Sequence, residues 1–264
     1  MSGDITKELT RQLEEEAARL RNHMTHLARV TTLAEVIGSI AHELNQPLSA
    51  ILSNAHAAQR MLPNGADPTE MSEILNDIVS EGKRAGEAIH RLRQLLKKGE
   101  RQHRFLNINE LVTDVLKLVR SYLIKQQVTA TTELAQNLPA LKGDSVELQQ
   151  VLVNLLVNAC DAMAGCNIVE RHLLIRTEME NGGNEVIVSV TDLGSGIPAD
   201  NLQQIFEPFF TTKENGVGLG LSVCRTIIAA HKGKLWATNN PDLGAAFHFS
   251  LPVSMPGTAT ITAT

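Results

Sequence analysis

Residues 40–48 read IAHELNQPL, a histidine followed at once by a glutamate within a run of helically spaced apolar residues. The imidazole of His42 presents one nitrogen to an electrophile, and the carboxylate of Glu43 can accept or hold the proton on the other nitrogen. Such a pair has the parts of a phosphorylatable nucleophile. Because His-Glu pairs are also common on solvated helix faces, the alternative is that His42 is only a polar helix residue.

The apolar residues around this stretch predict two long helices. The helical spacing of the first continues to about Met61, with a bend expected at Pro47, where a backbone donor is lost. Residues 62–68 read LPNGADP, a turn in which Asp67 can cap the second helix. We expect an antiparallel hairpin over residues 34–98, and two copies would bury its apolar stripe as a dimeric four-helix bundle.

Residues 1–33 carry a heptad pattern, in which Leu13, Leu20 and Leu27 repeat every seven positions with charges between them. This pattern is typical of a parallel two-stranded coiled coil, so we expect a coiled-coil helix that runs into the hairpin. The alternative is a single amphipathic helix that packs on its own domain.

The pattern changes after a polar, basic linker near residues 97–104. Alternating apolar residues then predict strands, and helically spaced ones predict helices. The expected strands cover about 105–108, 128–134, 173–179, 185–192, 234–238 and 246–251, and the expected helices cover about 108–122, 145–164 and 219–231. The fold class is therefore α+β, with an N-terminal helical hairpin followed by a two-layer α/β sandwich at 104–254. Residues 255–264 are rich in Thr and Ala and are expected to form a flexible tail.

Composition excludes several classes of protein. The formal net charge of -5 gives no support to nucleic-acid binding, and no apolar run reaches the roughly 18 residues needed to span a bilayer. The polar start does not resemble a signal peptide, and the three cysteines form no metal-ligand pattern. We therefore expect a cytoplasmic protein with reduced thiols and no membrane span in this chain.

Two motifs in the second half carry polar groups that suit a nucleotide. Asn154 and Asn158 are four residues apart and so share one face of an apolar helix, and an amide oxygen is a hard ligand suited to Mg²⁺. Residues 191–198 read TDLGSGIP directly after an expected strand. There Asp192 can accept a hydrogen bond from an exocyclic amine such as that of adenine, and the glycines let the backbone approach a flat ring. A polar helix face and a simple turn are the alternatives.

Two further motifs follow in the chain. Residues 205–213 read IFEPFFTTK, which predicts an aromatic anchor for a mobile segment that ends in a cation. Residues 216–222 read GVGLGLS and open a helix, and glycine-rich backbone at a helix N-terminus is suited to anions. This is neither a P-loop, since no G-K-[ST] follows, nor a Rossmann fingerprint, since it opens no βαβ unit.

Taken in order after a His-Glu hairpin, the four motifs resemble those of the sensor histidine kinases of two-component signalling. The resemblance covers about residues 30–252, and the wording HELNQPL is similar to the nitrogen-regulation and oxygen-sensing branch of that family. It implies a GHKL-type ATP-binding domain, ATP and Mg²⁺ as cofactors, and a homodimer formed through the hairpin. It also implies autophosphorylation on His42 and phosphoryl transfer to an Asp of a response-regulator receiver domain.

The resemblance assigns roles residue by residue. His42 would accept the phosphoryl group, Glu43 would take the imidazole proton, and Asn158 would bind Mg²⁺. Gln46 stands where relatives often carry the Thr or Asn that positions water for phosphatase activity. The residues implied in ATP binding are Asn154, Asn158, Asp161, Asp192, Gly194, Gly196, Ile197, Phe206, Thr212, Lys213, Gly216, Val217, Gly218, Leu219, Gly220 and Ala246. Among them, Ala246 stands where many relatives have a hydroxyl residue.

Two alternatives from other functional classes stay open at this point. The first is an ATPase of the same nucleotide-pocket superfamily, although those proteins lack a His-Glu hairpin before the pocket. The second is a phosphotransfer scaffold without kinase activity. Only about thirty residues precede the hairpin, which is compatible with a catalytic-core fragment or with a kinase that receives its signal from another protein.

Overall fold

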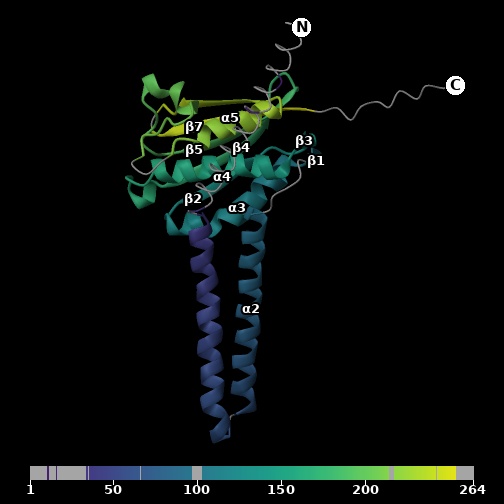
Figure 1. Cartoon of the computed structure of the whole chain (residues 1–264), viewed down its shortest axis with the longest axis vertical. Coiled ribbons are helices and arrows are strands. Elements are labelled where there is room, and N and C mark those ends of the chain that lie inside the picture. Colours follow the sequence, from purple (N-terminus) through teal and green to yellow (C-terminus); the bar gives the residue numbers. More distant parts are fainter. Residues whose placement is uncertain are drawn as a thin grey trace, which may run out of the picture.

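The computed structural model has two parts, a long helical hairpin and an α/β domain that lies at its open end (Figure 1). The structure describes residues 36–65, 67–96, 103–213, 217–241 and 243–253, together with positions 11, 16 and 34. The expected coiled coil at 1–33, apart from positions 11 and 16, the linker residues 97–102 and the whole expected tail at 255–264 lie outside the described residues.

The hairpin consists of a helix over residues 36–61, a short 3-10 turn η1 (Leu62–Asn64) and helix α2 (Pro68–Leu96). The Oδ1 of Asp67 accepts a hydrogen bond from the Thr69 N–H at 2.9 Å, which confirms the predicted cap. The first helix continues through Pro47. No helix in the described part of the chain is both long and apolar enough to cross a membrane.

The two ends of the hairpin differ in burial. At the open end, Val36 and Ile40 are 0% and 1% exposed and belong to the same hydrophobic cluster as the core of the α/β domain. Further down, four large apolar side chains are about half exposed or more. They are Leu48 (48%), Leu52 (58%), Leu75 (53%) and Val79 (57%). The lower hairpin thus leaves an apolar surface uncovered within a single chain.

The α/β domain contains three helices and seven strands among its described residues. The helices are α3 (Ile108–Lys125), α4 (Ser145–Ala162) and α5 (Gly220–Ala230). The strands are β1 (Arg104–Leu106), β2 (Thr129–Leu134), β3 (Leu141–Gly143), β4 (His172–Met179), β5 (Glu185–Asp192), β6 (Lys234–Asn239) and β7 (Ala245–Pro252). Short 3-10 turns lie at η2 (Ile168–Glu170), η3 (Ala199–Asn201) and η4 (Gln204–Phe206). Apart from β3, each of these strands and helices was predicted to within a few residues.

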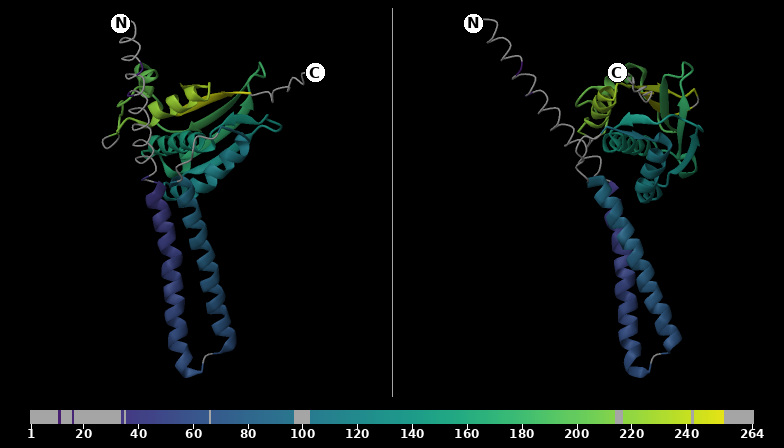
Figure 2. Two further views of the ribbon diagram at one scale, coloured as in Figure 1. Left: turned by 45° about the vertical axis from the view of Figure 1, so that its right-hand side comes forward. Right: turned by 90° about the vertical axis from the view of Figure 1, so that its right-hand side faces the viewer.

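Five strands form one sheet in the order β2-β4-β5-β7-β6, in which β2 and β4 run parallel and the other neighbours are antiparallel. The helices lie on one face of this sheet (Figure 2). On β5, Val186, Val188 and Val190 are at most 1% exposed, because alternate residues of the strand face the helix layer. The predicted two-layer α/β architecture is confirmed.

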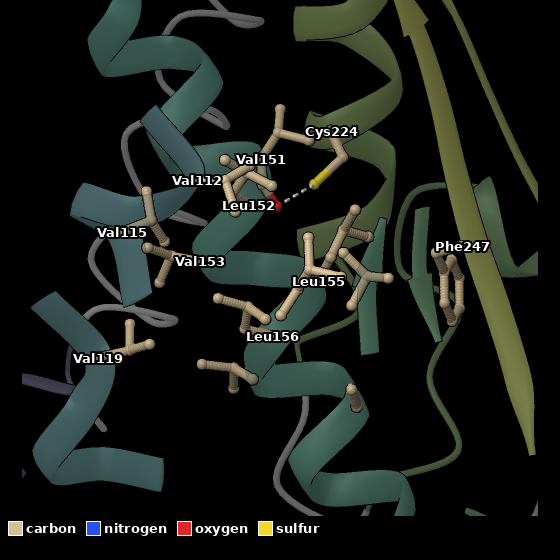
Figure 3. Close-up of a cluster of buried hydrophobic side chains, with 14 of the residues drawn as sticks. Val112, Val115, Val119, Val151, Leu152, Val153, Leu155, Leu156, Cys224 and Phe247 are labelled. Atoms are coloured by element: carbon tan, nitrogen blue, oxygen red, sulfur yellow. Dashed lines mark hydrogen bonds between the residues drawn. The ribbon is translucent and has the colours of Figure 1, made fainter. Parts of the chain in front are cut away.

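Helix α4 is the centre of the core, and its start is fixed by Asp144. The Oδ1 of Asp144 accepts the N–H groups of Val146 and Glu147, while the Asp144 N–H donates to Nε2 of the buried His231 at 2.9 Å. Figure 3 shows buried apolar side chains of α3, α4 and β7 in one cluster with Cys224 of α5. Because α4 is held by both neighbouring helices, the polar residues near its C-terminal end have a fixed position.

Candidate functional site

Asp192 ends the central strand β5 and is almost completely buried. Its Oδ1 accepts backbone hydrogen bonds from Gly194, at 2.8 Å, and from Ala245, at 3.3 Å. Burial raises the pKa of this carboxyl above its ordinary value, because water no longer stabilises the charge, and the two backbone donors partly oppose that shift. The carboxyl group is therefore held in one orientation by the backbone around it.

The turn after β5 needs glycine at two positions. A Cβ on Gly194 would lie 2.7 Å from the carbonyl oxygen of Ala162, the last residue of α4. Gly196 has a φ of 72°, in the left-handed region that favours glycine. The Ile197 N–H then donates to Oδ1 of Asn239 at 2.8 Å, and the Asn239 Nδ2 donates to the Ile197 carbonyl at 2.6 Å. The turn is thus fastened to α4 on one side and to β6 on the other.

Asn158 and Asp161 lie three residues apart on α4, and both contact Lys213. The Lys213 Nζ donates to Oδ1 of Asn158 at 2.9 Å and forms an ion pair with Oδ2 of Asp161. An amide oxygen and a carboxylate oxygen thus converge on one cation. The structure brings these three predicted site residues together, although Lys213 is 52 positions or more from the other two along the chain.

Asn154 lies one turn before Asn158 on α4, and its side chain is buried. It is 2% exposed, and its Nδ2 donates to the Gly220 carbonyl at 3.3 Å and to the Cys224 Sγ at 3.4 Å. Burial raises the pKa of the Cys224 thiol to about 12, so this thiol is an uncharged packing group. Asn154 therefore ties α4 to the start of α5, one turn away from Asn158.

Two residues at opposite ends of the segment between η4 and α5 are joined by a backbone hydrogen bond. The Phe209 N–H donates to the Gly218 carbonyl at 2.9 Å. Gly218 has a φ of 69°, and a Cβ there would lie 2.5 Å from the carbonyl carbon of Phe209. Just before this segment, the buried Phe206 packs edge-on against Phe247, with ring centroids 6.4 Å apart. We call the described residues of this stretch, 209–213 and 217–218, the lid segment.

The other glycine-motif residues have distinct environments. Thr212 and Val217 are exposed on the lid segment, whereas Leu219 is buried directly before α5. Gly220 begins α5, and a Cβ added there would meet nothing within 4 Å. Packing in the described part of the chain therefore gives no reason for glycine at that position. Gly216 lies outside the described residues.

Ala246 lies apart from these residues. It pairs with Thr191 across β7 and β5, so its side chain is on the sheet face opposite to that of Asp192. Its neighbour Ala245 donates the hydrogen bond to Asp192 instead. Gly244, with a φ of 83°, completes the contact, because a Cβ there would lie 2.0 Å from the Asp192 carbonyl oxygen. Strand alternation after Gly244 was the signal that could have identified Ala245 from the sequence.

His42 lies on the hairpin, within the first two described turns of the helix over residues 36–61. That end of the helix lies next to the α/β domain (Figure 1). The His42 side chain is exposed, Glu43 beside it is half-buried, and Gln46, one turn later, is exposed. The imidazole is therefore displayed on a helix surface, whereas Asp192 is enclosed in the α/β domain.

Two families match this chain. The family described as "Histidine kinase-, DNA gyrase B-, and HSP90-like ATPase" matches residues 143–255, and the "His Kinase A (phospho-acceptor) domain" matches residues 32–101. The first range contains Asp192 and the glycine motifs, and the second contains His42.

Relatives with both parts are similar over nearly the whole chain. The sensor histidine kinase TmoS of Ectopseudomonas mendocina is 35% identical over 95% of this chain and 26% of its own length. The sensor protein FixL of Bradyrhizobium diazoefficiens is 34% identical over 95% of this chain and 49% of its own length. The chain therefore spans half or less of the length of these relatives.

Two solved structures of the histidine kinase ThkA are similar to this one. Its nucleotide-free catalytic domain is 34% identical with a TM-score of 0.51, over 58% of this chain and 96% of that one. ThkA in complex with the response regulator protein TrrA is 29% identical with a TM-score of 0.50, over 91% of this chain and 66% of that one.

The sheet, its single helix layer and the Asp-Gly turn define an ATPase domain of the histidine kinase, gyrase B and Hsp90-like class. Joined to a phosphoacceptor hairpin, this domain has the organisation of a histidine kinase core. The chain belongs to the family of two-component sensor histidine kinases.

Proposed function

We propose that this chain transfers the γ-phosphoryl group of ATP to His42 and then passes it to an Asp of a response-regulator receiver domain. The main support for the proposal is that one chain contains both an exposed histidine pair and an enclosed polar turn. A hairpin displays the His42–Glu43 pair, and the α/β domain encloses Asp192 within a glycine turn.

The adenine end of ATP is assigned to the turn after β5. Both backbone hydrogen bonds to Asp192 end on Oδ1, which leaves Oδ2 to accept a hydrogen bond from the adenine amino group. Gly194 and Gly196 keep side chains away from the base, and Ile197 supplies an apolar neighbour beside it. Because Asp192 accepts but does not donate when ionised, it favours a base with an exocyclic amine at that point.

The phosphate end is assigned to the start of α5 and to the lid segment. The N-terminus of α5 follows Gly218 and Gly220, and exposed backbone N–H groups at a helix start favour anions. Lys213 adds a positive charge on the lid segment. These groups would bind the phosphates by charge and backbone contact, with little covalent participation, as phosphoryl transfer requires.

Asn158 and Asp161 are the residues that would hold Mg²⁺. Their oxygens converge on the Lys213 ammonium, which supports a cation site at this place, and both are the hard oxygen ligands that Mg²⁺ prefers. Within the described residues no group of three or more His, Cys, Asp or Glu side chains could hold a metal, so phosphates and water would supply the other ligands. The ion, when bound, neutralises charge on the phosphates.

His42 supplies the nucleophile. Its unprotonated ring nitrogen forms the new P–N bond while the bond from the γ-phosphorus to the β–γ bridging oxygen breaks and ADP leaves. Glu43 accepts the proton from the other ring nitrogen, and Gln46 lines the same exposed surface one turn later. Because His42 and Asp192 belong to different parts of the molecule, we expect reorientation of the α/β domain to gate the rate.

A homodimer and a receiver domain are the proposed partners. The uncovered side chains Leu48, Leu52, Leu75 and Val79 support the dimer, because a second hairpin would bury them in a four-helix bundle. The family of the hairpin, and the relative solved with its response regulator, support a receiver domain as the acceptor of the phosphoryl group.

The test is incubation of the whole chain with γ-labelled Mg-ATP, followed by acid and alkali treatment. His42→Ala should abolish an acid-labile, alkali-stable label, whereas His56→Ala, an exposed histidine on the same helix, should retain it. Label that survives in His42→Ala would contradict the proposal. Steady ATP turnover without any labelled protein would indicate an ATPase of the same superfamily instead.

A further inference from the structure

Two consecutive asparagines stand at the end of strand β6, and no sequence motif assigned a role to either of them. Asn239 is the last residue of β6, and Asn240 follows it. Asn239 pairs with Ala245 of β7, whose N–H donates to Oδ1 of Asp192 at 3.3 Å. The end of β6 therefore lies beside the residue that helps to orient the Asp192 carboxyl group.

The Asn239 side chain binds both main-chain groups of Ile197. Its Oδ1 accepts the Ile197 N–H at 2.8 Å, and its Nδ2 donates to the Ile197 carbonyl at 2.6 Å. A Cβ on Gly196 would lie 3.2 Å from the same Oδ1, so glycine at that position allows the amide to approach closely. Because one planar amide makes both bonds, it fixes the orientation of the Ile197 backbone as well as its position.

Asn240 binds the other end of the turn after β5, which comprises residues 192–197. Its Nδ2 donates to the main-chain carbonyl of Asp192 at 3.1 Å and to that of Leu243 at 3.1 Å. Its own N–H donates to the Gly244 carbonyl at 3.0 Å, so the backbone of Asn240 is itself held. The two asparagines thus fasten both ends of the turn to the end of one strand.

The position of the turn decides how strictly a base is selected. In the proposed ATP site, the Asp192 carboxyl group accepts the exocyclic amine while Ile197 lies beside the ring. A site built around one hydrogen bond rejects a ligand without that group only if the ligand cannot shift to a better position. If one end of the turn were released, Ile197 could move relative to Asp192, and a base with an oxygen in place of the amine would be rejected less strongly.

We propose that Asn239 and Asn240 are positioning residues that set the base selectivity of the ATP site, by fixing Ile197 relative to the Asp192 carboxyl group. This role deepens the proposed function and rests on its assignment of the adenine amine to Asp192. Asn239 acts through the main chain of the turn, because each end of its amide already bonds to Ile197.

The experiment measures, on the whole chain, the affinities for a non-hydrolysable ATP analogue and for the matching inosine analogue, which carries an oxygen in place of the amine. Asn239→Ala should lower the ratio of the two affinities about three- to tenfold, the effect of losing one or two hydrogen bonds. Asn239→Asp should lower the ratio as much, because a carboxylate oxygen would then face the Ile197 carbonyl. A wild-type ratio in both variants would overturn the proposal.

The matched control is Asn109→Ala, which removes another amide that bonds at both ends. The Asn109 Nδ2 donates to the Ala135 carbonyl at 2.8 Å, and its Oδ1 accepts the Thr177 hydroxyl at 2.7 Å. This variant should lower the unfolding temperature and leave the affinity ratio unchanged. Asn239 is exposed, so its replacement leaves no buried cavity. A lower unfolding temperature with a wild-type affinity ratio in Asn239→Ala would show a structural role alone and overturn the proposal.

Asp192→Asn separates failure of this role from failure of the proposed function. It should lose the preference for the ATP analogue, because its amide can donate to the inosine oxygen. A wild-type ratio in Asp192→Asn would overturn the adenine assignment, and the role of the asparagines with it. A lost preference in Asp192→Asn, with a wild-type ratio in Asn239→Ala, would overturn only the role of the asparagines.

Discussion

The hairpin and the α/β domain contain the same kinds of apolar residues but differ in how far these residues are buried. In the domain, apolar side chains of α4 such as Leu148, Val151 and Leu155 are completely buried. On the lower hairpin, Leu52 is 58% exposed and Val79 is 57% exposed. The domain closes its own core, whereas the hairpin has an apolar surface that no other described residue covers, and we propose that a second copy covers it.

The polar groups show the same contrast. Asp192 is buried, fixed by backbone donors and destabilised as an anion, which suits recognition of one base in one orientation. His42 is exposed on a helix, which suits its proposed role as a group that meets an ATP site and later a receiver domain. The difference suggests a division of roles. The residue proposed to recognise the base, Asp192, is enclosed in the α/β domain, whereas the residue proposed to bind several partners in turn, His42, is exposed on the hairpin.

The largest expected effect is loss of dimer affinity when a charge is placed on the uncovered apolar surface of the hairpin. Leu52 lies about as far from the turn as the residues between Leu75 and Val79, so these exposed apolar side chains lie at the same height of the hairpin. Leu52→Glu should weaken the dimer at least about a hundredfold, because a charge would be buried in the apolar interface. Ser53→Glu, at an exposed neighbouring position, should leave the dimer intact. Light scattering checks the molar mass, and a Leu52→Glu variant that stays dimeric would contradict this interface.

A smaller effect is expected on the free energy of unfolding, and it should differ between Gly218 and Gly220 of the α/β domain. Gly218→Ala should cost at least about 2 kcal/mol of unfolding free energy, since Gly218 has a positive φ and its Cβ would meet the Phe209 backbone. Gly220→Ala should leave stability unchanged or raise it by up to about 1 kcal/mol, because the added Cβ meets nothing.

Thermal unfolding and binding of an ATP analogue check this pair of variants. If Gly220 is needed for close approach of phosphate, Gly220→Ala should keep its stability and still lose nucleotide affinity about tenfold. Unchanged affinity in that variant would remove Gly220 from the phosphate site.

The smallest expected effect on stability concerns the buried charge of Asp192. Its pKa in the folded state is raised, so the fold is most favoured below the ordinary pKa of 3.8 and loses stability as the pH rises through the folded-state value. Asp192→Asn should therefore melt slightly above the wild type at pH 7, with a gap that narrows toward pH 4. The same variant should lose at least about tenfold in ATP affinity, because the adenine amine loses its acceptor. A melting gap that widens on acidification would contradict the assignment.

Most of the fold could be predicted because the strands alternate and the helices carry regular apolar stripes. Glu185–Asp192 was predicted to the residue, since its apolar positions alternate without interruption. Leu141–Gly143 was missed, because three residues do not show a period and the strand exists only through its pairing with Arg104–Leu106.

The sequence predicted which residues belong to the candidate site better than it predicted which of them contact one another. The motifs identified Asn158, Asp161 and Lys213, but nothing in their spacing indicates that the lysine meets both α4 residues across more than fifty positions of chain. Asn154 could not be distinguished from Asn158 by periodicity, because both lie on one face, and only the position of α5 buries it. The Lys213 contacts and the burial of Asn154 depend on tertiary packing, which local sequence patterns do not reveal.

The most direct test of the central claim, that the hairpin accepts what the α/β domain supplies, is to map the phosphoryl group by mass spectrometry under alkaline conditions after incubation with Mg-ATP. Binding of an ATP analogue to His42→Ala is measured alongside. The account predicts phosphate on His42 and unchanged nucleotide affinity in the variant. Phosphate on another residue of the wild-type protein, or loss of nucleotide binding in His42→Ala, would contradict it.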